Sequence, residues 1–210
     1  MSWLEQAVGR VAALVGLATL AIAVVAVLRS VRRPAGREEP FARLALRAPI
    51  LFAATLAFLA LLAWLWRPLP VHLLPGVRAA LAMMGGLLLL GGCGVYLWGL
   101  RTLGAQFAPS SGFGVRLHAD QRLIESGPYA FIRHPMYLAV MLATWGSLLL
   151  YQTWGTLAFA LMMFGLVVRA RREERVLEAE FGEAWRGYAA RVPAWLPRLS
   201  RSRPADGDRH

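Results

Sequence analysis

Five apolar stretches constrain this chain more than any other feature of its sequence. Three of them run from about Val8 to Leu28, from Ala48 to Trp66 and from Ala79 to Leu100. Each is close to the roughly 20 residues that a helix needs to cross the hydrocarbon of a bilayer. Two shorter stretches, Pro135 to Leu150 and Trp154 to Val168, are joined by three residues and predict a tight helical hairpin. The pattern predicts an all-α, polytopic membrane helix bundle of about five transmembrane helices that ends in this hairpin.

The composition agrees with a membrane protein. The chain is 58% hydrophobic, whereas soluble domains are usually about 45–50% apolar. Its net charge of +11 comes almost wholly from arginines at the ends of apolar runs, so topology explains the charge better than nucleic-acid binding does. The single Cys93 can form neither an internal disulfide nor a metal cluster, and we expect no metal site. We predict one domain over residues 1–199 and a disordered tail over residues 200–210.

The distribution of arginine predicts the orientation. Arginines are frequent after the first, third and fifth apolar stretches, whereas the loop after the second holds only Arg67 and Arg78 and the turn after the fourth holds none. Cytoplasmic loops carry the excess of basic residues, so the N-terminus is expected outside and the C-terminus inside. Segments 101–134 and 169–210 then share the cytoplasmic side. The arginine- and alanine-rich composition suggests a bacterial inner membrane.

The first polar cluster lies within residues 121–137. A turn precedes it, and Pro135 suits the first turn of the following helix. Helix N-termini attract anions, so an arginine and a histidine at this point indicate a site for a carboxylate or phosphate. The alternative is interfacial anchoring by snorkelling arginine and belt tyrosines. The candidate binding residues are Gly127, Pro128, Tyr129, Arg133, His134 and Tyr137.

The second polar cluster opens segment 169–188. Glu173 and Glu174 stand at the start of an apolar stripe, and Arg169 lies one helical turn before Glu173. Acidic residues near a bilayer are costly unless they are paired or functional. A simple ladder of Arg–Glu pairs is the alternative. The stripe consists of Leu177, Phe181, Trp185 and Tyr188, which recur at helical spacing.

Together the two clusters offer what S-adenosylmethionine requires. The carboxylate of this cofactor needs arginine or histidine, its ammonium needs a carboxylate, and its adenine needs an apolar slot. Its sulfonium requires the exclusion of water. Both clusters are predicted on the same side of the membrane, so one pocket could combine these groups, although other anionic cofactors would accept a similar pocket.

These residues also resemble a known family. GPYAFIRHPMY, followed by a hairpin and then by a second motif, is similar to the isoprenylcysteine carboxyl methyltransferases and the related phospholipid N-methyltransferases. The similarity covers about residues 100–197, with the first three apolar stretches matching only as hydrophobic segments. The second motif is Arg172-Glu173-Glu174, Leu177, Phe181-Gly182, Trp185, Tyr188, Val192-Pro193 and Pro197.

The resemblance implies a membrane-embedded site for S-adenosylmethionine, covered by the C-terminal segment, with a lipophilic acceptor or lipid entering from the bilayer. It implies cofactor contacts by Tyr129, His134, Tyr137, Glu173 and Glu174, with Arg169 near the reacting centre. We take Arg169 and Glu173 as the candidate catalytic residues. No obligate protein partner is evident. An NADPH-dependent sterol or enone reductase and a non-enzymatic scaffold remain the alternatives.

Overall fold

A computed structural model describes residues 3–31, 35–38, 48–107, 116–118 and 122–197, so the predicted tail 200–210 lies outside the described residues. The helices are α1 (Trp3–Val31), α3 (Ala48–Trp64), α4 (Pro75–Leu103), α5 (Pro135–Tyr151), α6 (Trp154–Met162), α7 (Gly165–Phe181) and α8 (Glu183–Arg191). Two short 3₁₀ turns, η1 (Gly104–Gln106) and η2 (Gly127–Ala130), follow α4 and precede α5. One antiparallel pair of short strands, β1 (Ala35–Glu38) and β2 (Arg116–His118), departs from a purely helical chain.

The helices are long and apolar enough to form an integral membrane protein. Among the described residues, three stretches meet both criteria for a membrane span, namely Trp3–Ser30, Pro75–Gln106 and Trp154–Phe181. Two further apolar helices, Phe52–Leu61 and Pro135–Tyr151, are shorter. The predicted fifth span is interrupted, because α6 ends at Met162 and α7 starts at Gly165. A helical bundle is therefore confirmed, and the number of crossings stays a prediction.

Glycines allow α4 and α5 to pack at backbone contact. A Cβ atom on Gly85 would lie 2.6 Å from the carbonyl oxygen of Gly146, and one on Gly92 would lie 2.6 Å from that of Ala139. Gly86 instead faces α1, where a Cβ would lie 2.5 Å from Val8. Close packing through small residues is typical of membrane helices, and these three glycines allow it here.

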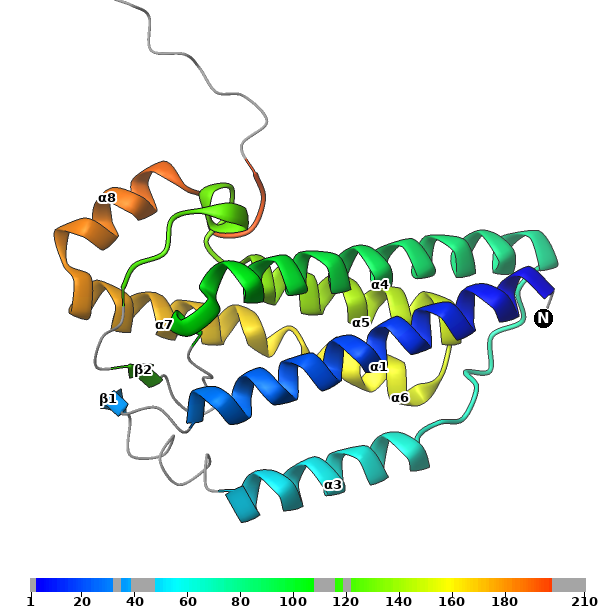
Figure 1. The fold of residues 1–210 in the computed structure, drawn as a ribbon. Helices are drawn as coiled ribbons and strands as arrows, with labels where there is room; N and C mark the ends of the chain where they lie inside the picture. Colours follow the sequence, from blue (N-terminus) through cyan, green and yellow to red (C-terminus); the bar gives the residue numbers. More distant parts are fainter. Residues whose placement is uncertain (1–2, 32–34, 39–47, 108–115, 119–121, 198–210) are drawn as a thin grey trace, which may run out of the picture.

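Polar contacts secure the end of the bundle that carries the N-terminus. Glu5 is buried and forms an ion pair with Arg78 at 3.4 Å, which ties α1 to α4. The predicted hairpin is confirmed: Gln152 adopts a left-handed conformation with a φ of 51°, and Thr153 caps α6 through a reciprocal capping box. In Figure 1, α1 runs beside α4 and passes in front of α5 and α6, and α3 lies on the other side of α1.

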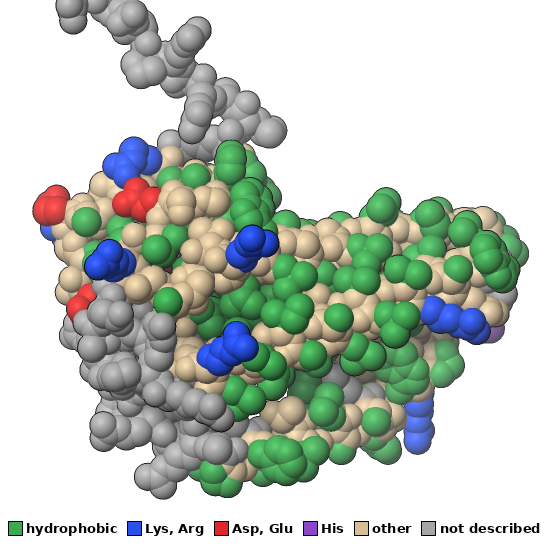
Figure 2. Space-filling view, in the orientation of Figure 1, with side chains coloured by type: hydrophobic (Ala, Val, Ile, Leu, Met, Phe, Trp, Pro, Cys, Tyr) green, Lys and Arg blue, Asp and Glu red, His purple; other side chains and the backbone are tan. Residues whose placement is uncertain are grey.

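The other end of the bundle carries the motifs. There, η2, α7 and α8 gather around the ends of α1 and α4, opposite the N-terminus (Figure 1). Figure 2 shows hydrophobic side chains along the helices of this face, with charged side chains mainly at the two ends. Large apolar side chains such as Leu17, Phe52 and Leu87 are exposed, as expected for surfaces that face lipid. Both motif segments therefore lie at one end of the molecule.

Candidate active site

The first motif is shaped by its turn. Gly127 has a φ of +59°, which L side chains rarely adopt, and a Cβ at this position would lie 2.5 Å from the hydroxyl oxygen of Thr102. Glycine therefore lets η2 rest directly on the C-terminal turn of α4. Pro128 is buried beneath the turn, and Pro135 occupies the first position of α5. This places residues 129–134 at the N-terminus of α5.

The C-terminal segment covers this loop. The backbone N–H of Arg133 donates to the carbonyl of Pro193 at 2.9 Å, and that of His134 donates to Ala194 at 3.1 Å. The hydroxyl of Tyr188, a residue that is only 2% exposed, donates to the carbonyl of Tyr129 at 2.8 Å. These bonds join α8 and the segment after it to the first motif across about sixty residues of sequence.

The apolar stripe is divided between two helices. We treated residues 169–188 as one helical pattern, but Gly182, with a φ of 53°, ends α7 and begins α8. The stripe still converges, because Trp185 and Tyr188 form a buried cluster against which Leu177 and Phe181 pack. Glycine at the end of a helix is the usual signal for such a turn. The effect is that α8 folds back over the first motif.

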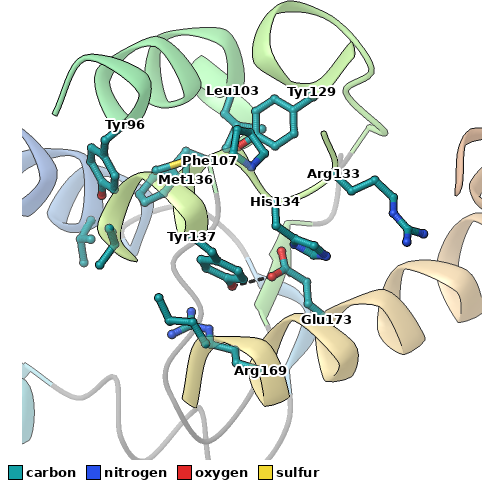
Figure 3. Close-up of a pocket in the computed structure, with 14 residues that line it drawn as sticks. Tyr96, Leu103, Phe107, Tyr129, Arg133, His134, Met136, Tyr137, Arg169 and Glu173 are labelled. Atoms are coloured by element: carbon teal, nitrogen blue, oxygen red, sulfur yellow. Dashed lines mark hydrogen bonds between the residues drawn. The ribbon is translucent and has the colours of Figure 1, made fainter. Parts of the chain in front are cut away.

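A cavity of about 270 Å³ lies where the two motifs meet. Its walls come from α1, α4, the loop before α5, α5 itself and α7. Tyr96, Leu103, Phe107, Met136, Val140 and Leu166 supply aromatic and aliphatic surface, and Tyr129, Arg133, His134, Tyr137, Arg169 and Glu173 supply polar groups. Figure 3 shows the side chains of Tyr137, Glu173 and Arg169 close together between α5 and α7, whereas the side chain of Arg133 points away from them.

Tyr137 is at the centre of the polar groups. Its hydroxyl donates to Oε2 of Glu173, which links α5 to α7 (Figure 3). Its ring stacks parallel to the imidazole of His134, with centroids 5.5 Å apart and planes 4° apart. The guanidinium carbon of Arg169 lies 5.3 Å from the centroid of the same ring. One tyrosine therefore fixes the positions of a carboxylate, an imidazole and a guanidinium.

Glu174 lies on the other side of His134. Its Oε1 is 2.9 Å from Nε2 of His134 and 3.3 Å from Nη2 of Arg133. Arg133 also stacks its guanidinium on Trp185, with 5.8 Å between the guanidinium carbon and the ring centroid. Glu174 does not line the cavity. Its geometry is that of a residue that orients the histidine, which is buried and contacts Trp195 on its other side.

Burial keeps the phenol of Tyr129 neutral. Desolvation, with a further contribution from the Glu173 carboxylate, raises the pKa of Tyr129 far above its ordinary value. Burial also raises the pKa of Tyr188 to about 12. Tyr129 therefore presents a neutral hydroxyl to the cavity at any physiological pH and is not a phenolate base.

Most of the predicted site residues come together, but three lie outside the cavity wall. Tyr129, Arg133, His134, Tyr137, Arg169 and Glu173 line the cavity, whereas Gly127 and Pro128 shape its loop and Glu174 supports His134. The sequence reasoning missed Tyr96, Phe107 and Val27. Tyr96 gave a usable signal, since it places a phenol within an otherwise apolar span. Nothing in the local sequence distinguished Val27 or Phe107.

Comparisons with known proteins identify the class. Residues 80–184 match the phospholipid methyltransferase family. The chain belongs to this family. This confirms the resemblance on which the two motifs were interpreted.

Individual relatives differ in the acceptors that their names specify. The chain is 33% identical to methanethiol S-methyltransferase 2 of Bradyrhizobium diazoefficiens over 70% of this chain and 58% of the relative. It is 31% identical to methanethiol S-methyltransferase of Pseudomonas deceptionensis over 74% of this chain and 61% of the relative. A shorter match, 31% identical over 37% of this chain and 34% of the relative, is to protein-S-isoprenylcysteine O-methyltransferase of Schizosaccharomyces pombe. The chain thus spans about three fifths of the two bacterial relatives.

Proposed function

We propose that this protein transfers a methyl group from S-adenosylmethionine to a lipophilic acceptor at the cytoplasmic face of a bacterial inner membrane. The observation that supports it most directly is the cavity, where the two motifs contribute the carboxylate of Glu173, the guanidinium of Arg169 and the imidazole of His134 to an otherwise aromatic and aliphatic space. The family match supports methyl transfer as the reaction. The orientation, with the N-terminus outside, rests on the placement of arginine.

The chemistry of the cavity fits the cofactor. S-adenosylmethionine, when bound, supplies an electrophilic methyl group on a positively charged sulfur. Glu173 would hold the ammonium of the amino-acid part, and the imidazole of His134 would hold its carboxylate. The guanidinium of Arg133 turns away from the cavity toward Glu174 and Trp185. Leu103, Met136 and the aromatic side chains offer the apolar surface that a nucleoside base requires. Glu174 would not contact the cofactor itself but would support its binding, because it holds the imidazole of His134 in position.

The remaining polar groups serve the acceptor. The side chain of Arg169 projects from α7 toward the part of the cavity where we place the polar head of the acceptor. Its guanidinium lies over the ring of Tyr137, which directs it into the cavity. We assign it the orientation of an anionic or polar head. Glu173 accepts a hydrogen bond from Tyr137, so the pair could also take a proton from a thiol or an ammonium. A carboxylate acceptor would need no base, and positioning with desolvation would suffice.

The C-terminal segment covers the loop that carries Arg133 and His134. Two hydrogen bonds join the backbone N–H groups of residues 133 and 134 to the carbonyls of residues 193 and 194, and a third runs from the hydroxyl of Tyr188 to the carbonyl of Tyr129. Trp195 lies against the face of His134, with ring centroids 5.4 Å apart. Electrostatic interactions strengthen when water is removed, so this cover favours both cofactor binding and transfer.

A binding assay tests the proposal. Purified protein in detergent should bind labelled S-adenosylmethionine and not NADPH, and extracted lipids should then carry the methyl label. Glu173→Gln should weaken cofactor binding by roughly 10- to 150-fold, because a charge-assisted hydrogen bond contributes about 1.5–3 kcal/mol. Glu178→Gln on the same helix should change little, since Glu178 is exposed and pairs with Arg186 away from the cavity. Binding of NADPH alone would favour a reductase, and equal effects of both variants would contradict the assignment of Glu173.

A further inference from the structure

A second polar pocket lies between α7 and α8, outside the candidate active site. Its volume is about 290 Å³. Its charged lining consists of four arginines and two glutamates, which together give a formal charge of +2: Arg133, Arg171, Arg175, Arg186, Glu174 and Glu178. Figure 2 shows basic and acidic side chains gathered at the end of the molecule that α7 and α8 form.

The α7 residues of this pocket form one face of the helix. They are spaced i, i+3, i+4 and i+7, at positions 171, 174, 175 and 178. Arg169 and Glu173, which line the active-site cavity, fall on the opposite side of the helix at about 100° per residue. Arg172 falls between the two faces and lines neither space. One helix therefore separates the pocket from the cavity.

Arg133 is held in place at the wall of the pocket. Its side chain is 17% exposed, and its guanidinium carbon lies 5.8 Å from the ring centroid of the buried Trp185. Nη2 forms the ion pair with Glu174, and Nε is buried with no hydrogen-bond partner in the described part of the chain. A guanidinium that is already fixed loses little conformational entropy when it meets an anion.

Two arginines of the pocket carry unpaired charge. Both glutamates are engaged, Glu174 in the ion pair just described and Glu178 with Arg186 at 3.4 Å. Arg171 and Arg175 are exposed, and neither forms an ion pair with any residue that the structure describes. Arg175 uses only Nε within the chain, to donate to the carbonyl of Arg171 at 3.4 Å. Guanidinium groups in this state favour a phosphate, which they can bind through paired hydrogen bonds.

The position of the pocket along α7 indicates the source of the phosphate. Arg169 directly follows the apolar run 166–168, which places it at the edge of the hydrocarbon. Arg171 and Arg175 lie about 3 Å and about 9 Å beyond it along the helix axis. The headgroup layer is roughly 5–8 Å deep on each side of the hydrocarbon. The two guanidiniums therefore lie at the level of the phospholipid phosphates.

We propose that this pocket binds the phosphate of an anionic phospholipid. Arg171 and Arg175 donate hydrogen bonds to the phosphate oxygens, and Arg133 adds a third positive charge at the wall. Because α8 contributes Trp185 and Arg186 to the same pocket, a bound phosphate connects α7 to α8 at the membrane surface. The site is separate from the methyl-transfer cavity, and its assignment does not depend on the proposed function.

Two adjacent arginines provide a matched test. Arg171 and Arg172 are both exposed, but only Arg171 lines the pocket. The full chain in detergent is titrated with phosphatidylglycerol or phosphatidylcholine, and bound lipid is counted by native mass spectrometry. The wild type should prefer phosphatidylglycerol. Arg171→Gln should weaken its binding about tenfold, as expected for the loss of one charge-assisted hydrogen bond, and Arg172→Gln, with the same change in net charge, should leave it unchanged.

Two further measurements complete the test. Arg175→Gln should weaken phosphatidylglycerol binding as Arg171→Gln does, and SDS unfolding midpoints equal to that of the wild type should show that all three variants are folded. Equal effects of Arg171→Gln and Arg172→Gln would mean that lipid responds to net charge alone and would overturn the site. Equal binding of the two lipids would overturn it as well. Inorganic phosphate that binds the wild type as tightly as phosphatidylglycerol does would overturn the assignment to a lipid in favour of a soluble anion.

Discussion

Gly91 and Gly92 allow the contact between α4 and α5 to be tested with one kind of substitution. Replacement of glycine by alanine at either position favours the helix by about 1 kcal/mol from helix propensity alone. A Cβ at Gly91 would meet nothing within 4 Å, whereas one at Gly92 would lie 2.6 Å from the oxygen of Ala139 and 2.8 Å from the nitrogen of Ala143. The propensity gain cancels between the variants, so their difference measures the clash.

The clash is with backbone atoms and cannot be relieved by a rotamer change. Ordinary contact begins at 3.4 Å, so α5 would have to move by several tenths of an ångström. Overpacking of this kind costs about 1–3 kcal/mol. We therefore expect Gly92→Ala to be less stable than Gly91→Ala by about that amount in an SDS unfolding titration of the detergent-solubilised protein. Ala143→Gly should not rescue it fully, because the two nearest clashing atoms are main-chain atoms that glycine retains.

The Gly92 substitution should also affect the site. Tyr96 on α4 and Tyr137 on α5 both line the cavity, so separation of these helices should lower cofactor affinity in Gly92→Ala but not in Gly91→Ala. Equal unfolding midpoints for the two variants would refute the close approach of α4 and α5. Equal midpoints would also remove the physical reason for glycine at position 92.

Three further outcomes follow from the same geometry. Tyr188→Phe removes the hydrogen bond to the carbonyl of Tyr129, so we expect a loss of stability of about 1 kcal/mol and weaker cofactor binding; an unchanged melting temperature would argue against α8 as a cover. Arg169→Lys, like Arg169→Ala, should lower turnover while leaving cofactor affinity nearly intact, because lysine cannot form the bidentate hydrogen bonds of a guanidinium. Equal losses of turnover and of cofactor affinity would contradict the role of Arg169 in orienting the acceptor. A topology reporter fused at Ser200 should report the cytoplasm and one in loop 69–75 the outside, and the reverse result would contradict the predicted orientation.

Much of the bundle could be predicted because its signals are local. The length of an apolar stretch, the arginines that flank it and the turn at Gln152-Thr153 can each be recognised within a short segment of sequence. The structure has helices at all five predicted apolar stretches. The break between α6 and α7 was missed because Met163 and Phe164 are as apolar as their neighbours. The end of α7 was recoverable from Gly182, since glycine there adopts a positive φ. The short β1–β2 pair joins segments about eighty residues apart, so local periodicity could not reveal it.

The site was predictable in its residue types but not in its division of roles. Glu173 and Glu174 are adjacent, so helical geometry directs their side chains about 100° apart, and only one of them can face a given cavity. The sequence could not identify which, because that depends on how α7 rotates against α5. In the structure Tyr137 on α5 contacts Glu173, and His134, the residue that precedes α5, contacts Glu174, so the two carboxylates are engaged separately. The two adjacent glutamates therefore occupy different positions: the carboxylate of Glu173 lines the cavity, and that of Glu174 contacts the imidazole of His134, which shares the cavity wall.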